Sequence, residues 1–105
     1  MSYRFVVCTF PDADVARRVT RQLVEEQLAA CGNLLPGAES IYRWKGAVET
    51  ASEVVVFYKT TEAGYPALEA RLKALHPYEV PEILALPIEA GFPGYLRWVA
   101  ENVKA

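Results

Sequence analysis

The stretch YRFVVCTF, residues 3–10, decides the fold of this chain. It is rich in β-branched and aromatic residues and almost continuously apolar, which is typical of a central strand buried on both faces. The stretch EVVVFYKT, residues 53–60, has the same character and predicts a second central strand. The other predicted elements lie between and after these two strands along the chain.

A helix is predicted after each central strand. The first starts after Asp12 or Asp14, either of which can cap it, and ends at Gly32, where a positive φ carries no steric penalty. The residues on its buried face are Val15, Val19, Leu23, Leu28 and Cys31. The second helix begins near Pro66 and ends just after His76. The residues on its buried face are Leu68, Leu72 and Leu75.

A long hairpin is predicted between the two helices. Residues 33–45 form one strand bent at Pro36-Gly37, and the proline indicates an edge position because it has no N–H to donate. Gly46 begins the turn, and residues 53–60 are the returning strand. Residues 83–88 are a fourth strand, and residues 95–103 are a short C-terminal helix.

The element order β-α-β-β-α-β predicts a ferredoxin-like α+β fold, a split βαβ sandwich with an extra C-terminal helix. Its strand order is 4-1-3-2, which places the two most apolar strands at the centre. Both long helices then cover one face of the sheet. The opposite face also receives Phe, Val and Tyr side chains, and an exposed apolar face of this size indicates a partner. We therefore expect an oligomer.

Composition limits the class of protein further. At 105 residues, the chain has room for a single domain, residues 1–105. Its net charge of −2 is dispersed, so no basic surface for nucleic acid or anionic lipid is expected. No apolar run approaches the roughly 18 residues of a membrane span. No secretory signal is recognised, so we expect a cytoplasmic protein in which Cys8 and Cys31 are reduced thiols.

Five short patterns occur in a fixed order along the whole chain. They are Leu28-Ala-Ala-Cys31, Ser40-x-Tyr42-x-Trp44-x-Gly46, Glu53 with Lys59-Thr60, His76-Pro-Tyr78-x-x-Pro81-Glu-Ile83, and Tyr95-Leu-x-Trp98. Each is weak alone, but the set in this order resembles the CutA divalent-cation tolerance family.

The resemblance implies the same ferredoxin-like fold and adds a quaternary structure. It implies a homotrimer in which the long second and third strands run into neighbouring subunits, roughly as in PII signal proteins. The family is named for metal-tolerance phenotypes, and copper binding is often ascribed to its members. Gly32 departs from the family pattern, since similar sequences often carry Val or Ala there, and only a local change at the helix end is expected.

The candidate metal ligands are Cys31, Cys8 and His76. A thiolate is a soft ligand suited to Cu(I), so a copper site using Cys31, together with its copies in a trimer, is chemically reasonable. The alternative is that both cysteines are small buried hydrophobes. The chain has no CxxC motif and a single His, which argues against a zinc site of the usual spacing.

A candidate cleft between subunits combines groups from the hairpin and from the end of the second helix. The residues expected there are Trp44, Glu53, Lys59, His76, Tyr78, Glu79 and Glu82. Both charge signs are present, as expected of a site for a small polar ligand or an ion. The alternatives are structural hydrogen bonding at the helix end and, for Tyr42 and Trp44, packing across an interface.

No catalytic motif is recognised in the sequence. A glycine-rich phosphate loop, a GxSxG elbow and an HExxH helix are all missing, so we do not expect an enzyme. The preferred hypothesis is a trimeric protein that takes part in the response to divalent metal ions. Two alternatives stay open. One is a PII-like signalling module that binds a small metabolite or nucleotide between subunits, and the other is a structural trimer that anchors a partner protein.

Overall fold

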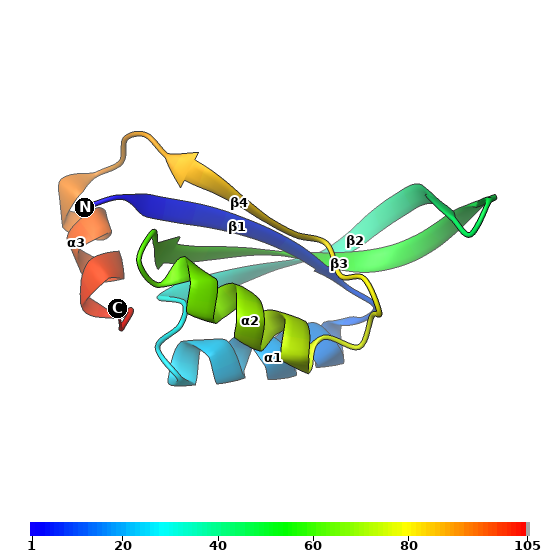
Figure 1. Ribbon diagram of the computed structural model, residues 1–105, viewed down its shortest axis with the longest axis horizontal. Helices are drawn as coiled ribbons and strands as arrows, with labels where there is room; N and C mark the ends of the chain where they lie inside the picture. The colour runs from blue at the N-terminus through cyan, green and yellow to red at the C-terminus, as the bar shows by residue number, and fades with distance from the viewer. Residues whose placement is uncertain (105) are drawn as a thin grey trace.

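A four-stranded sheet with two helices on one face and a third helix at one end forms the structure, a computed structural model that describes residues 1–104 (Figure 1). The elements in chain order are β1 (Tyr3–Phe10), α1 (Ala13–Glu25), β2 (Cys31–Trp44), β3 (Ala47–Thr61), α2 (Tyr65–Leu75), β4 (Ile83–Ile88) and α3 (Pro93–Glu101). None of the three helices is long and apolar enough to cross a membrane.

The strand order is β2-β3-β1-β4, which is the predicted order 4-1-3-2 counted from the other edge. All neighbouring strands are antiparallel, and β1 pairs with both β3 and β4, so that Cys8 lies opposite Val56 on one side and Ile83 on the other. The prediction that the two most apolar strands occupy the centre is therefore confirmed. The edges of the sheet are β2 and β4.

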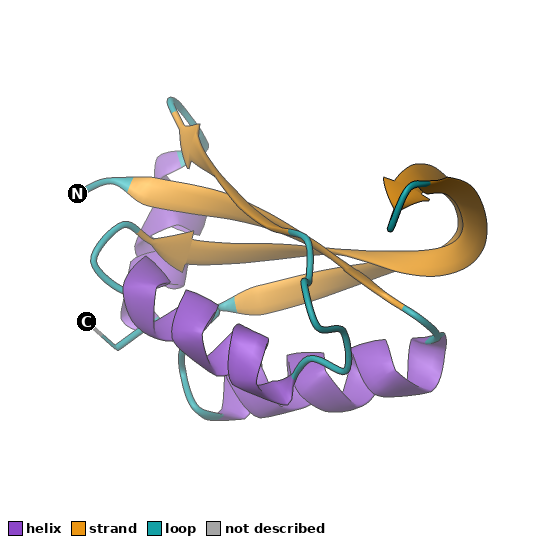
Figure 2. Cartoon of the chain, turned by 45° about the vertical axis from the view of Figure 1, so that its right-hand side comes forward, coloured by secondary structure: helices purple, strands orange, loops and turns teal. Residues whose placement is uncertain are grey.

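The core lies between the sheet and the two long helices, which cover the same face (Figure 2). Alternate residues of the central strands point into it and are fully or almost fully buried, namely Val6, Cys8 and Phe10 of β1 and Val54, Val56 and Tyr58 of β3. Helix α1 contributes Val19 and Leu23, and α2 contributes Leu68 and Leu72. Asp12 caps α1 as predicted, with its side chain accepting a hydrogen bond from the Val15 N–H at 2.9 Å.

The first helix is shorter than its apolar spacing predicts. It ends at Glu25, and Gln27 takes a left-handed conformation with φ of 58°. Leu28 and Ala29 still pack against the core, so the apolar periodicity continues beyond the helix although the helical backbone does not. Consequently Cys31 begins β2, and Gly32 lies within that strand and not at a helix end. The prediction for Gly32 was wrong in this respect.

The hairpin is longer than predicted, because β3 begins at Ala47 and not at residue 53. The bend predicted at Pro36-Gly37 is confirmed, since the register of β2 against β3 shifts between Leu35 and Ala38. Beyond this bulge the two strands form a ribbon, residues 38–53, which we call the arm. Every side chain from position 41 to position 50 is exposed. The far end of the arm curls back on itself (Figure 2).

The face of the sheet opposite α1 and α2, which we call the open face, is largely apolar. Its apolar side chains are Phe5 and Val7 of β1, Leu35 of β2, Val55 and Phe57 of β3, and Leu84 and Leu86 of β4. The rings of Phe5 and Phe57 lie 4.9 Å apart at its centre. Helix α3 reaches only one end of this face, where Val99 and Val103 pack with Tyr3. The predicted apolar face is therefore present in the described chain.

Candidate functional site

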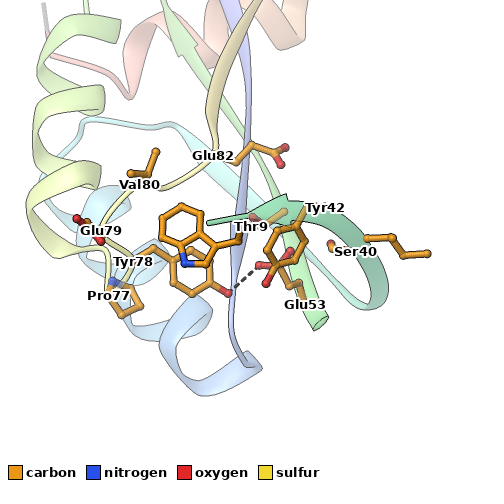
Figure 3. A pocket seen from close by; sticks show the side chains of 11 residues that line it. Thr9, Ser40, Tyr42, Glu53, Pro77, Tyr78, Glu79, Val80 and Glu82 are labelled. Atoms are coloured by element: carbon orange, nitrogen blue, oxygen red, sulfur yellow. Dashed lines mark hydrogen bonds between the residues drawn. The ribbon is translucent and has the colours of Figure 1, made fainter. Parts of the chain in front are cut away.

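A cavity of about 650 Å³ lies at the arm end of the open face. Its walls come from three places: the end of β1, the arm, and residues 77–82, which connect α2 to β4 (Figure 3). Three aromatic rings line it, those of Tyr42, Trp44 and Tyr78, and three carboxylates do so as well, those of Glu53, Glu79 and Glu82. A single chain thus already forms a pocket from five of the seven residues that the sequence assigns to a cleft.

Tyr78 and Glu53 meet across this pocket. The Tyr78 hydroxyl donates a hydrogen bond of 2.7 Å to Oε2 of Glu53, which ties the segment after α2 to β3 (Figure 3). Glu53 is only 9% exposed, although it is charged and its partner is neutral. Burial, followed by the nearby carboxylate of Glu53, raises the pKa of Tyr78. The phenol therefore stays protonated and serves as a hydrogen-bond donor.

His76 lies behind the pocket wall and is structural. Its Nδ1 accepts the backbone N–H of Tyr78 at 3.1 Å, so the ring proton is on Nε2, which donates to the carbonyl oxygen of Thr9 at 2.7 Å. The ring stacks on Phe10 at 4.7 Å between centroids. Both ring nitrogens are thus engaged, which leaves no lone pair for a metal. Burial lowers the pKa of His76, against the opposing effects of the Thr9 hydrogen bond and the Glu53 charge.

The lowered pKa of His76 predicts that the protein loses stability in mild acid. Below about pH 6.5 the imidazole is protonated in the unfolded chain but remains neutral in the folded one, so the free energy of unfolding falls as the pH falls. His76→Gln should remove this dependence. Urea unfolding at pH 7.5, 6.5 and 5.5, at one protein concentration, measures it. His76 is the only histidine, so parallel pH profiles for the two proteins would contradict the prediction.

The two cysteines lie on opposite faces of the sheet. Cys8 is fully buried and faces the helices, and burial, reinforced by the charges of Glu82 and Glu53, raises its pKa to about 12. Cys31 faces the open side and lies 3.4 Å from the Tyr95 hydroxyl of α3. One chain therefore does not bring Cys8, Cys31 and His76 together. Among residues 1–104, no group of three His, Cys, Asp or Glu residues is arranged to hold a metal ion.

Lys59 lies well away from the pocket. It follows Glu53 on the same face of β3 by six residues, which separates the two by about 20 Å. Its ammonium group donates a hydrogen bond to the side-chain oxygen of Asn33, and its strand partner is Cys31. In the described part of the chain, no lysine or arginine is among the residues that line the pocket. The expectation of a cleft with both charge signs is therefore not met within one chain.

Some pocket residues were not predicted as site residues. Thr9, Ser40, Ile41, Pro77 and Val80 also line the cavity, and Tyr42 was treated as an interface residue. The alternation of residues 39–45 already places Ser40 and Tyr42 on the same strand face as Trp44. This pattern could have identified both as pocket residues. Thr9 carries no comparable signal, because only the packing of residues 77–82 brings it to the pocket.

Comparison with known proteins gives consistent matches over more than nine-tenths of the chain. The profile of a family described as CutA1 divalent ion tolerance protein matches residues 4–102. The divalent-cation tolerance protein CutA of Thermus thermophilus is 53% identical over 97 residues, which cover 92% of this chain and 94% of that protein. Protein CutA of Mus musculus is 48% identical over 99 residues, but those cover 94% of this chain and only 55% of that longer protein.

Solved structures show the same likeness. The Thermus thermophilus divalent cation tolerance protein superimposes with a TM-score of 0.94 at 50% identity, covering 97% of this chain and 99% of that one. CutA from Xylella fastidiosa superimposes with a TM-score of 0.96 at 40% identity, covering 99% of this chain and 100% of that one.

Proposed function

Because this chain belongs to the CutA1 divalent ion tolerance family, we propose that it acts in the response to divalent metal ions as a cytoplasmic homotrimer. The observation that carries the quaternary part is the open face. Phe5, Phe57, Leu84 and Leu86 form a continuous apolar surface that a monomer would leave in water. Closing three copies around this face would also pair or cover the edge strands β2 and β4.

The proposal includes no enzymatic role, because three of the candidate acids, bases and nucleophiles, namely Cys8, Tyr78 and His76, are held in unreactive forms. Burial raises the pKa of the Cys8 thiol to about 12, and burial together with Glu53 keeps the Tyr78 phenol protonated. His76 uses both ring nitrogens in hydrogen bonds to the backbone. The cytoplasmic part of the proposal is supported by the two free thiols, because free thiols persist in a reducing compartment.

Cys31 is the thiol that we propose for copper. It is partly exposed, whereas Cys8 is sealed in the core, and a thiolate is the soft ligand that Cu(I) prefers. One chain offers a single accessible thiol, and Cu(I) takes two or three ligands. Copper binding through Cys31 therefore requires copies from neighbouring subunits or an additional ligand from solution.

A competitive Cu(I) titration under reducing conditions tests this proposal. We expect the wild-type protein to compete with a chromophoric chelator, Cys31→Ser to lose this competition, and Cys8→Ala to retain it. Cys8→Ala is the matched control because it removes the other thiol. Equal copper retention by wild type and Cys31→Ser would show that Cys31 is not the ligand. Absence of competition by the wild type would reject copper binding altogether.

A second function, a PII-like module that responds to a small ligand, is favoured by one observation. The pocket has the size and the aromatic lining of a small-molecule site and uses none of the proposed copper ligands. The two functions are compatible, because a trimer that senses metal through Cys31 can carry a separate ligand pocket.

A further inference from the structure

The pocket at the base of the arm has an acidic lining. Glu53, Glu79 and Glu82 contribute carboxylates, and no basic side chain is among the lining residues of the described chain. Glu53 is the most confined of the three, being 9% exposed, and it receives a hydrogen bond from the neutral Tyr78 hydroxyl and not from a cation. A carboxylate can accept further donors after that bond. A confined negative charge of this kind favours a positively charged ligand.

Aromatic rings surround this charge. Tyr42, Trp44 and Tyr78 line the same cavity, and aromatic faces attract ammonium and guanidinium groups through the ring quadrupole. The Trp44 ring already takes part in one such contact, with the Lys45 ammonium 5.7 Å from its centroid. A site that combines carboxylates with several rings differs from an inorganic ion site, which is built from oxygen, nitrogen or sulfur ligands alone.

The size of the cavity leads to the same class of ligand. Its volume of about 650 Å³ lies within the usual range of small-molecule sites, roughly 300–1,000 Å³. A hydrated or bare metal ion would leave most of that space unfilled. Moreover, the three carboxylates do not form a metal-holding group in the described chain.

We infer that this pocket binds a small organic cation, an ammonium or guanidinium group carried on a compact apolar body. The charged head would lie near Glu53, held also by the field of Glu79 and Glu82, and the body would lie against the aromatic rings. The ligand contacts differ from those of the proposed copper site, since Cys31 lies opposite Lys59, about 20 Å along β3 from Glu53. Failure of either proposal therefore leaves the other standing.

The test compares three probes of similar shape and different charge: benzylammonium, benzyl alcohol and benzoate. The only two tryptophans are Trp44 and Trp98, so in a Trp98→Phe background the fluorescence reports on the pocket. We expect benzylammonium to bind the assembled protein about tenfold or more tightly than benzyl alcohol, benzoate not to bind, and added salt to weaken the cation. Binding of the alcohol and the cation with equal affinity would overturn the inference.

Variants assign the binding to the pocket. Glu79→Gln with Glu82→Gln removes two exposed charges from its rim and should weaken benzylammonium about tenfold without unfolding the protein. Glu25→Gln with Glu101→Gln changes the net charge equally on exposed helical positions and should leave the affinity unchanged. Equal weakening by both pairs would mean that only the overall charge matters, and would overturn the inference.

Two further results complete the test. Cys31→Ser should bind benzylammonium as the wild type does, whatever its copper affinity. Saturable Mn²⁺ binding sensed by Trp44, with no response to benzylammonium, would reassign the pocket to a metal ion and overturn the inference.

Discussion

Replacing Phe57 with glutamate is expected to convert a trimer of about 35 kDa, three times the 11.7 kDa of one chain, into monomers. Phe57 lies on β3 at the centre of the open face, with its ring 4.9 Å from that of Phe5. A carboxylate at this position would have to leave water when three copies close around the face, and its two cross-strand partners, Val7 and Asn33, offer it no positive charge. The penalty is several kcal/mol for each copy.

The glutamate should not unfold the single chain, because the Phe57 side chain points away from the core between the sheet and the helices. Sedimentation equilibrium at micromolar concentration measures the mass, and far-ultraviolet circular dichroism checks the fold. Ala67→Glu adds the same charge on the exposed side of α2 and should leave the trimer intact. A Phe57→Glu protein that stays trimeric, or a wild type that sediments near 11.7 kDa, would contradict the proposed interface.

Gly32→Ala is expected to lower the free energy of unfolding by about 2 kcal/mol, although the change adds only one methyl group. In this chain a Cβ on Gly32 would lie 2.5 Å from Cγ2 of Thr20 and 3.0 Å from Cε1 of Tyr58. Thr20 cannot simply rotate away, because its hydroxyl is bonded to the Tyr58 hydroxyl at 2.8 Å in a buried pair. The clash therefore outweighs the smaller gain, about 0.4–1 kcal/mol, from restricting the unfolded chain.

A second substitution separates crowding from other causes. Thr20→Ser removes the methyl group that the new Cβ would meet and keeps the hydroxyl that bonds Tyr58. We expect Thr20→Ser with Gly32→Ala to recover a large part of the lost stability, so that a double-mutant cycle gives a favourable coupling of about 1 kcal/mol. Chemical denaturation of the four proteins measures it. Additive effects of the two substitutions would show that crowding by the Thr20 methyl group is not the reason for glycine at position 32.

The predictable part of the fold follows from burial. The strands at residues 3–10 and 53–60 carry apolar side chains both on the face packed against the helices and on the open face, and this leaves a signal in the sequence. The returning half of the arm leaves almost none, since residues 47–52 are exposed except for the partly buried Ala51 and are held in a strand by backbone pairing with β2. The last residue of α1 could not be predicted from the apolar spacing either. Leu28 and Ala29 pack against the core and continue that spacing, although the helix ends at Glu25.

The candidate site was predictable where its residues lie on one segment or follow from the strand order. Tyr78, Glu79 and Glu82 lie on one connecting segment, and the strand order brings Trp44 of the arm near that segment. Lys59 was expected with Glu53 in one cleft between subunits, but within one chain six residues of extended β3 separate the two side chains. Histidine is a common metal ligand, so the sequence favours such a role for His76. Only the two hydrogen bonds between its ring and the backbone reveal that it is structural.

The central position of β1 has a consequence for the order in which the chain can fold during synthesis. Both of its hydrogen-bonding partners, β3 and β4, come much later in the chain, and β4 ends at Ile88. Until those residues have left the ribosome, β1 is an apolar strand with unpaired backbone groups along one or both sides. Segments of this kind are prone to aggregate in nascent chains. Folding can therefore finish only after nearly the whole domain has been synthesised, and a chain interrupted before Ile83 would expose its most aggregation-prone strand.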